Sequence, residues 1–577
     1  MRMTRRSGDL PVYGTAVALI GAAYLLRVWL LQVRDFNPDE FEHMHDAWLF
    51  AKGMFPYRDY FEVHPPWFYF LLWPLFHLFD AENSSASAVA IMFFTRGCMW
   101  LITGICLALT FRLGTLWRDV RVGCVSALFL ANARMFTQTT LQIRPDVPAT
   151  AFWLAALIAT MKAVRAHEPA TWRARGLFTL AGLLLGAATM CTQKVLYAAP
   201  GIGVALLWYI LDPRSRGDLR SRLVGVLHAG AGFATPIALT FAYFAAHQAG
   251  AAFIDALVIK PLRWKVHFPP DSYIRQLVRQ DPFVAALAVV GFARAGARMF
   301  RTPEFLRGDP ICVLSALALF VGAFRIGIPY QQYFDSLMPL GAVLGAGFFI
   351  EALDGLAAWL GNERPHRPWN LDAVAAVAGF VFVLALALAV ARPDVGHVPL
   401  YIGLWVIALA AASWSLLRQR ISWAAAVLLV ALSAYPLDQM RWVARDNTDT
   451  LAEIRYVLDH SGPTDICMDG FSGRGVFRPH AYYYYMLHRE IRATLSEQDR
   501  AALLSGLESG AVAPKLIFLD EDLRNVSPSI TSFLEAHYQP VGLGAIWRRT
   551  EDFAKPDASS DARLGFQAAV GPSSRAP

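Results

Sequence analysis

Residues 37–70, NPDEFEHMHDAWLFAKGMFPYRDYFEVHPPWFYF, combine acidic residues and histidines with aromatics and a Pro-Pro pair, directly after the first long apolar run of the chain. The acidic and histidine residues of interest are Asp39, Glu40, Glu42, His43, His45, Asp46, Glu62 and His64. Charged side chains are costly to hold near lipid, so such a cluster at the end of a membrane span is by default a functional site. The stretch therefore predicts a polar site at one surface of a membrane protein.

The composition of the whole chain agrees with a polytopic membrane protein. Of its 577 residues, 56% are hydrophobic and 17% are charged, and the apolar residues form long blocks separated by short arginine-rich segments. The net charge of +7 lies in these segments and is explained by membrane topology rather than by nucleic acid. The six cysteines show no CxxC or framework spacing, which argues against a zinc cluster or a disulfide scaffold.

The apolar blocks predict about thirteen transmembrane helices. They lie near residues 12–33, 87–111, 122–142, 148–164, 176–193, 195–211, 223–246, 282–300, 310–325, 336–359, 371–391, 399–417 and 421–436. The first block has span length and no small-x-small cleavage site, so we predict a retained helix rather than a signal peptide. The shorter apolar segment 67–79 is predicted to lie at the membrane interface.

The positions of lysine and arginine predict the orientation. Alternate connections are short and basic, at residues 2–6, 112–121, 162–175, 214–222, 294–307, 364–367 and 418–420, whereas most of the opposite set is longer and mixed in sign. The positive-inside rule then places the N-terminus in the cytoplasm. The first loop, residues 34–86, and the C-terminal part of the chain fall on the outer face.

The composition changes after residue 436, where the predicted transmembrane domain (1–436) ends. Three segments are typical of short strands, namely PTDICMDGF, PKLIFLDEDL and GAIWRRT. Two segments are typical of amphipathic helices, namely SEQDRAALLSGLES and SPSITSFLEAHY, the second with Ser527 as its cap. We predict a small α/β domain over residues 437–551 on the outer side. Residues 552–577, rich in Pro, Ser, Ala and Asp, are predicted to be a disordered tail.

Within the first loop, a helix is predicted from about Glu40 to Ala51. Its spacing puts Glu42, His45 and Asp46 on one face, which suits a divalent cation or a sugar. The alternative is an amphipathic helix whose charges simply face water. For Asp39 we favour the functional interpretation, because it lies at the membrane boundary beside a second carboxylate.

Polar residues of the other outer loops are further candidates. Arg144 and Asp146, in QIRPDVPA, are either functional or a local ion pair that closes a hairpin. Cations on the outer side run against the orientation bias, so a lipid phosphate is a natural ligand for them, with headgroup snorkelling as the alternative. Candidates for substrate binding are Arg58, His64, Arg144, Asp146, Lys194, Lys260, Arg263 and Tyr333.

Asp520-Glu521-Asp522 follows the apolar strand KLIFL, the setting of the DxD motif of soluble glycosyltransferases. The C-terminal domain is too small for a nucleotide-sugar fold and lies on the wrong side of the membrane for that substrate. We therefore interpret DED as a turn at the end of a strand. Walker A, GxGxxG and GxSxG motifs do not occur in the sequence.

The chain resembles family 39-type membrane glycosyltransferases of the C fold, relatives of protein O-mannosyltransferases and of the lipid A aminoarabinose transferase. The residues that carry the resemblance are Asp39-Glu40, the stretch from Gly53 to Tyr57, Glu62 with Pro65-Pro66, and Arg144-Pro-Asp146. The resemblance covers residues 10–340, and the layout of thirteen spans with an outer domain is similar to that of the aminoarabinose enzyme. It implies a bacterial inner membrane, with the C-terminal domain in the periplasm.

The resemblance also implies an activity, namely transfer of a sugar with inversion from a polyprenyl-phosphate carrier to a lipid, glycan or protein acceptor. The family's two acidic positions match Asp39 and Glu62, and Glu40 beside Asp39 is a third catalytic candidate. A cation or metal is expected at the leaving phosphate, and Glu62, His64 and His45 are the candidate ligands of a divalent cation. Two positions that are basic in the aminoarabinose enzyme hold other residues in this chain. The first is Glu42, and the second is Val63 or His64.

Two other activities are compatible with the sequence. A polymerase or ligase of lipid-linked oligosaccharides would use closely similar chemistry. A secondary transporter would need ionisable sites near the membrane centre and internal repeats. The polar residues of this chain instead gather at the outer ends of the spans, and no repeat is visible, so a glycosyltransferase is the favoured prediction.

Overall fold

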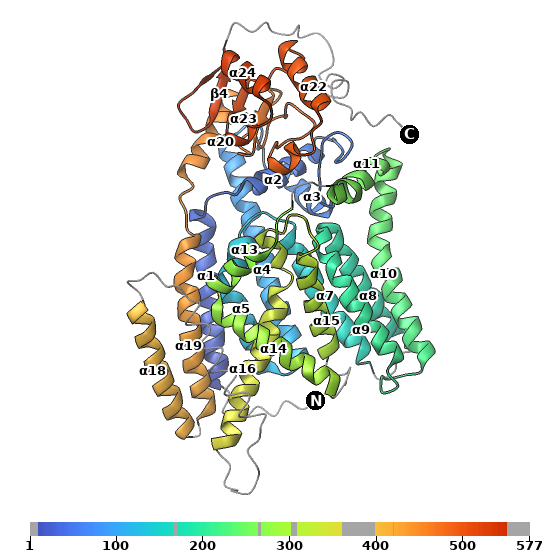
Figure 1. The fold of residues 1–577 in the computed structure, drawn as a ribbon, viewed down its shortest axis with the longest axis vertical. Helices are drawn as coiled ribbons and strands as arrows, with labels where there is room; N and C mark the ends of the chain where they lie inside the picture. The colour runs from blue at the N-terminus through green and yellow to red at the C-terminus, as the bar shows by residue number, and fades with distance from the viewer. Residues whose placement is uncertain are drawn as a thin grey trace.

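A computed structural model of the chain describes residues 10–166, 171–263, 267–301, 308–360, 398–418 and 420–550. The predicted span at 371–391 and the predicted tail at 552–577 lie outside these residues. The described chain is mostly helical, and Figure 1 shows a long helical bundle with the C-terminal domain at one end.

Twelve apolar helices build the bundle. They are α1 (Leu10–Val33), α4 (Ser85–Trp117), α5 (Val120–Asn132), α7 (Asp146–Val164), α8 (Trp172–Cys191), α9 (Ala199–Leu211), α10 (Leu219–Ala246), α14 (Pro282–Arg301), α15 (Asp309–Ala323), α16 (Met338–Leu360), α18 (Val398–Leu417) and α19 (Ile421–Gln439). In the described part of the chain, nine helical segments are long and apolar enough to cross a membrane, and three apolar helices are shorter. The chain is therefore a multi-pass membrane protein, as its apolar blocks predict.

The predicted spans that fall on described residues coincide with these helices, with one difference. The block at 122–142 is divided at Ala133 into α5 and the short helix α6 (Arg134–Thr140), because the backbone of Ala133 is extended. The total of thirteen spans stays a prediction, since residues 371–391 are not described.

Small residues let neighbouring helices approach closely. α8 packs against α7 and α10, and α14 packs against α16. A Cβ atom on Gly186 of α8 would lie 2.6 Å from the carbonyl oxygen of Phe233 on α10, so only glycine fits there. Close contact through glycine is the usual way in which helices gain packing energy inside a membrane, where the hydrophobic effect does not drive association.

The first loop forms helix α2 (Pro38–Ala51), followed by α3 (Trp67–Leu72) and the 3₁₀ helix η2 (Trp73–His77). Asn37 caps α2, and its side chain accepts a hydrogen bond from the Asp39 backbone N–H (3.0 Å). The predicted helix is confirmed, but the water-facing alternative is wrong. Nine of its fourteen residues are buried, because α2 lies between the bundle and the C-terminal domain (Figure 1).

The C-terminal domain contains a four-stranded sheet in the order β1-β2-β4-β3. Strand β1 (Cys467–Asp469) runs parallel to β2 (Leu516–Phe518), whereas β4 (Ile546–Arg549) is antiparallel to both β2 and β3 (Tyr538–Pro540). The longer helices around it are α20 (Thr448–His460), α22 (Glu497–Glu508) and α24 (Pro528–His537). The three predicted strands and both predicted helices form, and β3 is an addition. Ser527 occupies the cap position of α24 but makes no capping hydrogen bond.

The C-terminal domain packs tightly onto α2. Phe41, Met44 and Trp48 of α2 share a hydrophobic core with Val476 and Phe477 of the domain. Gly473 has a left-handed backbone (φ 72°), and a Cβ atom there would lie 2.6 Å from the Phe41 Cβ. The first loop thus forms part of the interface between the two parts of the chain.

Shorter helices complete the connections. They are η3 (Gln193–Ala198), α11 (Gly250–Ile254), the π-helical turn η4 (Asp255–Ile259), α12 (Lys260–Arg263), α13 (Asp271–Gln280), η6 (Gln331–Phe334), η7 (Met440–Val443), α21 (Arg489–Arg492) and α23 (Glu521–Arg524). Several of them contribute residues to the cavity that we describe next.

Candidate functional site

A cavity of about 760 Å³ lies where the bundle, the first loop and the C-terminal domain meet. Its polar lining residues come from segments far apart in the sequence. They are Asn37, Asp39, Glu42, His64, Arg144, Gln193, Lys194, Arg325, Gln331, Gln332, His488, Arg489, Glu490 and Asp522. The apolar and aromatic surface of the cavity comes from Tyr197, Pro261, Leu262, Phe268, Tyr273, Ile326, Ile328, Tyr330, Tyr333 and Phe471. The cavity thus offers charges of both signs beside an apolar wall.

Asp39 and Arg144 form an ion pair on the cavity wall, with 2.7 Å between the Asp39 Oδ2 and the Arg144 Nη1. The Arg144 Nη2 also donates to the Asn37 Oδ1 (3.3 Å). Burial would raise the pKa of Asp39, but the Arg144 guanidinium together with His43, His488 and His64 holds this pKa below its usual range. Asp39 is therefore an ionised, oriented carboxylate.

Glu40 lies next to Asp39 but points away from the cavity. It is fully buried, and its oxygens accept hydrogen bonds from Arg96 Nε (2.8 Å) and Nη2 (2.6 Å) of α4. The backbone N–H groups of Asn37 and Ile143 donate to the same carboxylate. Arg96 also donates to the carbonyl oxygens of residues 31, 34 and 35, so all five of its N–H groups are used.

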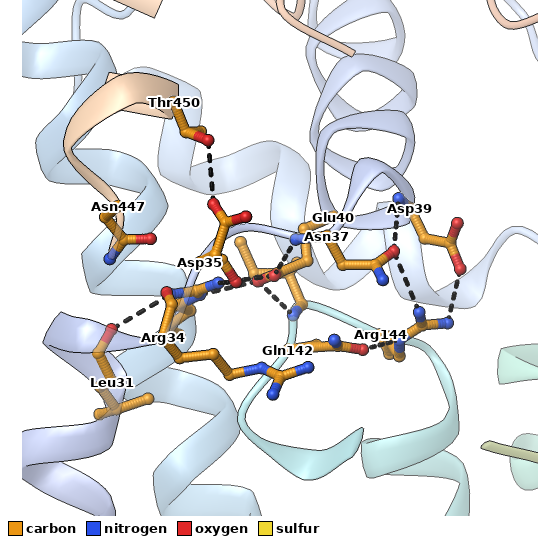
Figure 2. A network of polar contacts seen from close by, with 12 residues as sticks. Leu31, Arg34, Asp35, Asn37, Asp39, Glu40, Gln142, Arg144, Asn447 and Thr450 are labelled. Carbon is orange, nitrogen blue, oxygen red and sulfur yellow. Dashed lines mark hydrogen bonds and ion pairs between the residues drawn. The ribbon is translucent and has the colours of Figure 1, made fainter. Parts of the chain in front are cut away.

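The catalytic role predicted for Glu40 stays a prediction, and its buried carboxylate does not line the cavity. Figure 2 shows Glu40 within a polar network that joins the end of α1 to the start of α2, while Asp39 and Arg144 lie at its edge. Because every partner of Glu40 is part of the protein, this carboxylate holds the first loop in place.

A second ion pair joins Lys194 of η3 to Asp146 at the start of α7, with Nζ–O distances of 3.0 and 3.2 Å. The ammonium group also lies 4.4 Å from the ring centre of Tyr333. The predicted local pair between Arg144 and Asp146 is not the arrangement found, since each residue has a different partner. Lys194 and Arg144 thus present two cations to the cavity.

Glu62 lies behind the wall and holds His64. The Glu62 Oε1 accepts a hydrogen bond from the His64 Nδ1 (2.7 Å). Glu62 is 1% exposed, whereas His64 lines the cavity. Burial raises the pKa of Asp46 and the adjacent Glu62 carboxylate raises it further, so Asp46 keeps its proton and shares it with Glu62. Burial would also raise the pKa of Glu62, but the hydrogen bonds from Asp46 and His64 lower it overall.

Glu42 lies one helical turn after Asp39 and lines the cavity. In the described part of the chain its carboxylate has neither a hydrogen-bond nor an ion-pair partner. Burial and, secondly, the Glu62 carboxylate raise the pKa of Glu42 to about 8. The predicted face of Glu42, His45 and Asp46 is therefore divided, because only Glu42 lines the cavity.

The C-terminal domain closes one side of the cavity. The His488 Nδ1 lies 2.7 Å from the Glu490 Oε2, and the Tyr330 hydroxyl donates to the Glu490 Oε1 (2.9 Å). Burial alone would lower the pKa of His488, but Glu490 and Glu42 raise it above its usual value. Asp522, from the DED segment, pairs with Arg492 (2.7 Å), and Asp520 caps α23 through the Leu523 N–H (2.8 Å). The DED segment follows strand β2, but instead of the predicted turn it forms the N-cap and the first two residues of α23.

Two guanidinium groups in the cavity are without a partner among the described residues. Arg325 comes from the loop after α15 and Arg489 from the start of α21, and both are solvent-exposed. Every other arginine and lysine of the cavity lining is ion-paired within the described structure. These two side chains are therefore available for an anionic ligand.

Besides Asp146, which pairs with Lys194 and does not line the cavity, three predicted binding residues lie elsewhere or are not described. Arg58 forms a two-bond pair with Asp59 and donates to the His247 carbonyl oxygen (3.0 Å), which fastens the first loop to α10. Lys260 lies over the rings of Phe61, Tyr483 and Tyr484 rather than in the cavity lining. Arg263 ends α12, and its side chain falls outside the described structure.

The predicted metal ligands are not brought together. Both ring nitrogens of His45 are used, since Nδ1 lies 2.7 Å from the Val476 carbonyl oxygen and Nε2 lies 2.8 Å from the His480 Nδ1. Glu62 and His64 are paired at a different place. Over the described ranges, no group of three or more His, Cys, Asp or Glu residues is arranged to hold a metal ion.

Sequence reasoning missed the contribution of the C-terminal domain. His488, Arg489 and Glu490 follow the aromatic run AYYYYML, and this dense aromatic segment before HRE is the signal that could have drawn attention to them. Arg325 gave no signal, because it lies between an apolar helix and the segment IGIPY. Only the folded chain shows that these residues share one cavity.

Comparisons with known proteins support the fold. Residues 63–262 match the family model described as dolichyl-phosphate-mannose-protein mannosyltransferase. A search of curated protein sequences gives no match. Among solved structures, ArnT from Cupriavidus metallidurans bound to undecaprenyl phosphate has a TM-score of 0.55 at 14% identity, covering 94% of this chain and 99% of ArnT. The same protein in the apo state gives 0.56 at 14% identity, over 93% and 97%.

An oligosaccharyltransferase from Archaeoglobus fulgidus in the apo form is a more distant neighbour, with a TM-score of 0.48 at 12% identity over 94% of this chain and 75% of that one. The similarity to ArnT extends over nearly the full length of both chains, including the C-terminal domain. This shared fold, together with the family match over residues 63–262, confirms the resemblance of the chain to C-fold, family 39-like membrane glycosyltransferases.

Proposed function

We propose that the chain is an integral-membrane glycosyltransferase that moves a sugar, with inversion, from a polyprenyl-phosphate carrier to a lipid, glycan or protein acceptor. The observation that carries this proposal is the cavity itself. It combines the carboxylates of Asp39 and Glu42 with the unpaired guanidinium groups of Arg325 and Arg489 at the end of an apolar helical bundle.

The cavity suits an amphipathic donor. Leu262, Ile326 and Ile328 form part of its lining, and Leu262 is 79% exposed. An isoprenoid chain can lie against such a surface while its phosphate reaches the cations further in. Arginine binds phosphate through two parallel hydrogen bonds and lysine binds it as a point charge, so Arg325, Arg489 and Lys194 are the proposed phosphate ligands. ArnT, whose fold the chain shares, is bound to undecaprenyl phosphate in its crystal structure.

The acceptor chemistry requires a carboxylate. A hydroxyl group is a poor nucleophile, and a positioned base that takes its proton as the bond to the sugar forms contributes about 10²–10⁴-fold to the rate. The charge that develops on the departing phosphate is stabilised by nearby cations. Asp39 and Glu42 supply carboxylates to the cavity and Arg325, Arg489 and Lys194 supply cations, so the residues for both roles are present in its lining.

The proposed orientation follows from the basic connections. We place the N-terminus in the cytoplasm and the cavity with the C-terminal domain in the periplasm, in a bacterial inner membrane. The basic turn between α9 and α10 lies at the end of the bundle opposite the C-terminal domain (Figure 1). The proposed division into a transmembrane domain (1–436), a periplasmic domain (437–551) and a tail (552–577) accords with this arrangement.

The experiment that tests this function uses purified full-length protein with a panel of radiolabelled polyprenyl-phosphate sugars and candidate acceptors, separated by thin-layer chromatography. Time-dependent transfer of label from at least one carrier supports the proposal. If every carrier-linked sugar remains unchanged while undecaprenyl phosphate also fails to bind, the proposal is wrong.

Substitution of the free arginines tests the donor site within that assay. Arg325→Gln and Arg489→Gln should each raise the donor KM by about 10–100-fold with little change in kcat, because a hydrogen bond to a charged group contributes about 1.5–3 kcal/mol. Arg455→Gln is the matched control, since Arg455 is an exposed arginine of α20 that does not line the cavity. Equal effects of all three substitutions would indicate a general charge effect.

A further inference from the structure

We propose that Glu42, rather than Asp39, is the group that accepts the proton of the acceptor hydroxyl. This inference rests on the proposed function and assigns a role within the same cavity. Glu42 and Asp39 are three residues apart on α2, so both side chains emerge on one face of the helix. Both line the cavity, but their surroundings differ.

The partners of the two carboxylates distinguish them. Asp39 is held by Arg144 at 2.7 Å, and a carboxylate that already neutralises a guanidinium has little affinity for a further proton. Glu42 has no direct partner in the described structure, although it is half-buried. A half-buried carboxylate without a donor has its lone pairs free for a hydroxyl group that enters the cavity.

The surroundings of Glu42 also raise its affinity for a proton. Burial is the largest factor that raises the pKa of Glu42, and the Glu62 and Asp39 carboxylates raise it further. His488 and Arg144 lower it. The titratable and charged groups that face this part of the cavity are Asp39 and His43 of α2, Glu62 and His64 of the first loop, Arg144, and His488 and Glu490 of the C-terminal domain. The balance leaves the pKa of Glu42 at about 8, whereas that of Asp39 is lowered.

The proposed step conserves atoms and charge. The oxygen of the acceptor hydroxyl forms a bond to the anomeric carbon of the sugar, and its proton passes to the ionised Glu42 carboxylate. The bond between the anomeric carbon and the phosphate oxygen breaks, and its electron pair leaves with the polyprenyl phosphate, which gains one negative charge. The neutral Glu42 then releases its proton to water. Asp39, which stays paired with Arg144, orients the acceptor.

The first test is the pH dependence of kcat for the donor and acceptor pair that the wild-type protein uses. A base must be ionised to act, so kcat should rise with pH through about 8 and then become constant. Glu42→Gln should lower kcat by about 10²–10⁴-fold, change the acceptor KM by less than about threefold, and remove this rise from the residual activity. Glu42→Asp should keep the rise and recover part of kcat, which a merely structural residue would not do.

Two variants separate Glu42 from its neighbours. His488→Gln removes a positive group that lowers the pKa of Glu42, so the rise in kcat should persist but move to higher pH. If the rise disappears instead, His488 is the titrating group and the inference is wrong. Asp39→Asn should retain the rise. The inference is likewise overturned if Asp39→Asn loses the rise and most of kcat while Glu42→Gln keeps both.

A second measurement is independent of the reaction. Carbodiimides modify protonated carboxyl groups, so treatment of the purified protein with a water-soluble carbodiimide and glycine ethyl ester at pH 7, followed by peptide mass spectrometry, should label Glu42 but not Asp39. Bound undecaprenyl phosphate should protect Glu42. Labelling of Asp39 in preference to Glu42 would contradict the inference. Failure of all donors in the transfer assay, with Glu42 still labelled, would contradict only the proposed function.

Discussion

Asp39 and Arg144 form a 2.7 Å ion pair on the cavity wall, although they belong to the first loop and to the turn before α7. The pair joins two segments that are separated in the sequence by α3, η2, α4, α5 and α6. It neutralises the carboxylate of Asp39 and orients it toward the cavity. Asp39 and Arg144 should therefore act as one unit.

A double-mutant cycle tests this coupling. Asp39→Asn should raise the acceptor KM by about 10–100-fold, since it removes a charged hydrogen-bond acceptor, and Arg144→Gln should have a similar effect. The double variant should be little worse than either single variant, with a coupling energy of about 0.5–3 kcal/mol. Arg58→Gln is the control partner, because Arg58 binds Asp59 away from the cavity. Its effect should add to that of Asp39→Asn within about 0.5 kcal/mol.

Glu40 should influence stability rather than chemistry. Glu40→Gln leaves Arg96 buried without a counter-ion, and removal of one partner from a buried pair costs about 3–5 kcal/mol of the free energy of unfolding. Thermal unfolding in detergent can be followed by the reaction of buried cysteines, such as Cys191 and Cys467, with a thiol-reactive dye. Glu82→Gln is the control, since its pair with Lys52 is partly exposed to solvent and is expected to contribute less than about 1 kcal/mol. An unchanged unfolding temperature for Glu40→Gln would argue against its structural role.

Lys260 should join the C-terminal domain to the loop after α10 instead of binding substrate. Its ammonium group lies 4.7 Å from the ring centre of Phe61 and 5.5 Å from those of Tyr483 and Tyr484. Lys260→Met should lower the free energy of unfolding by about 1–2 kcal/mol and leave the donor KM unchanged, whereas Lys260→Arg should preserve stability. A tenfold rise in donor KM without a change in unfolding temperature would restore the role that the sequence suggested.

The orientation can be tested by labelling engineered cysteines in intact cells. Asn83→Cys, in the exposed turn before α4, should react with a membrane-impermeant maleimide added from outside, whereas Arg214→Cys, in the turn between α9 and α10, should react only after lysis. Cys98, which is half-buried, is replaced by Ser in the background, and the other cysteines are buried. The opposite pattern of labelling would put the cavity in the cytoplasm and remove the basis of the proposed donor chemistry.

The sequence by itself determined the local structure of this protein. The apolar blocks are long enough to satisfy their backbone hydrogen bonds within one helix, so their positions follow from composition alone. The start of α2 is equally local, because the Asn37 side chain caps a helix that has Pro38 and an acidic first turn. The strands β1, β2 and β4 are short apolar or alternating runs with turn residues beside them.

Only the tertiary structure decided which charged residues form the site. Helical periodicity separates Glu40 from Asp39 and Glu42, but packing against Arg96 of α4 determines which side faces protein and which faces the cavity. Arg325 and His488 come from segments that carry no motif, and they line one cavity only because the C-terminal domain packs against the bundle. Electrostatic partners are set by distances across the fold, so Arg144 pairs with Asp39 and Lys194 with Asp146 in a way that sequence spacing does not specify.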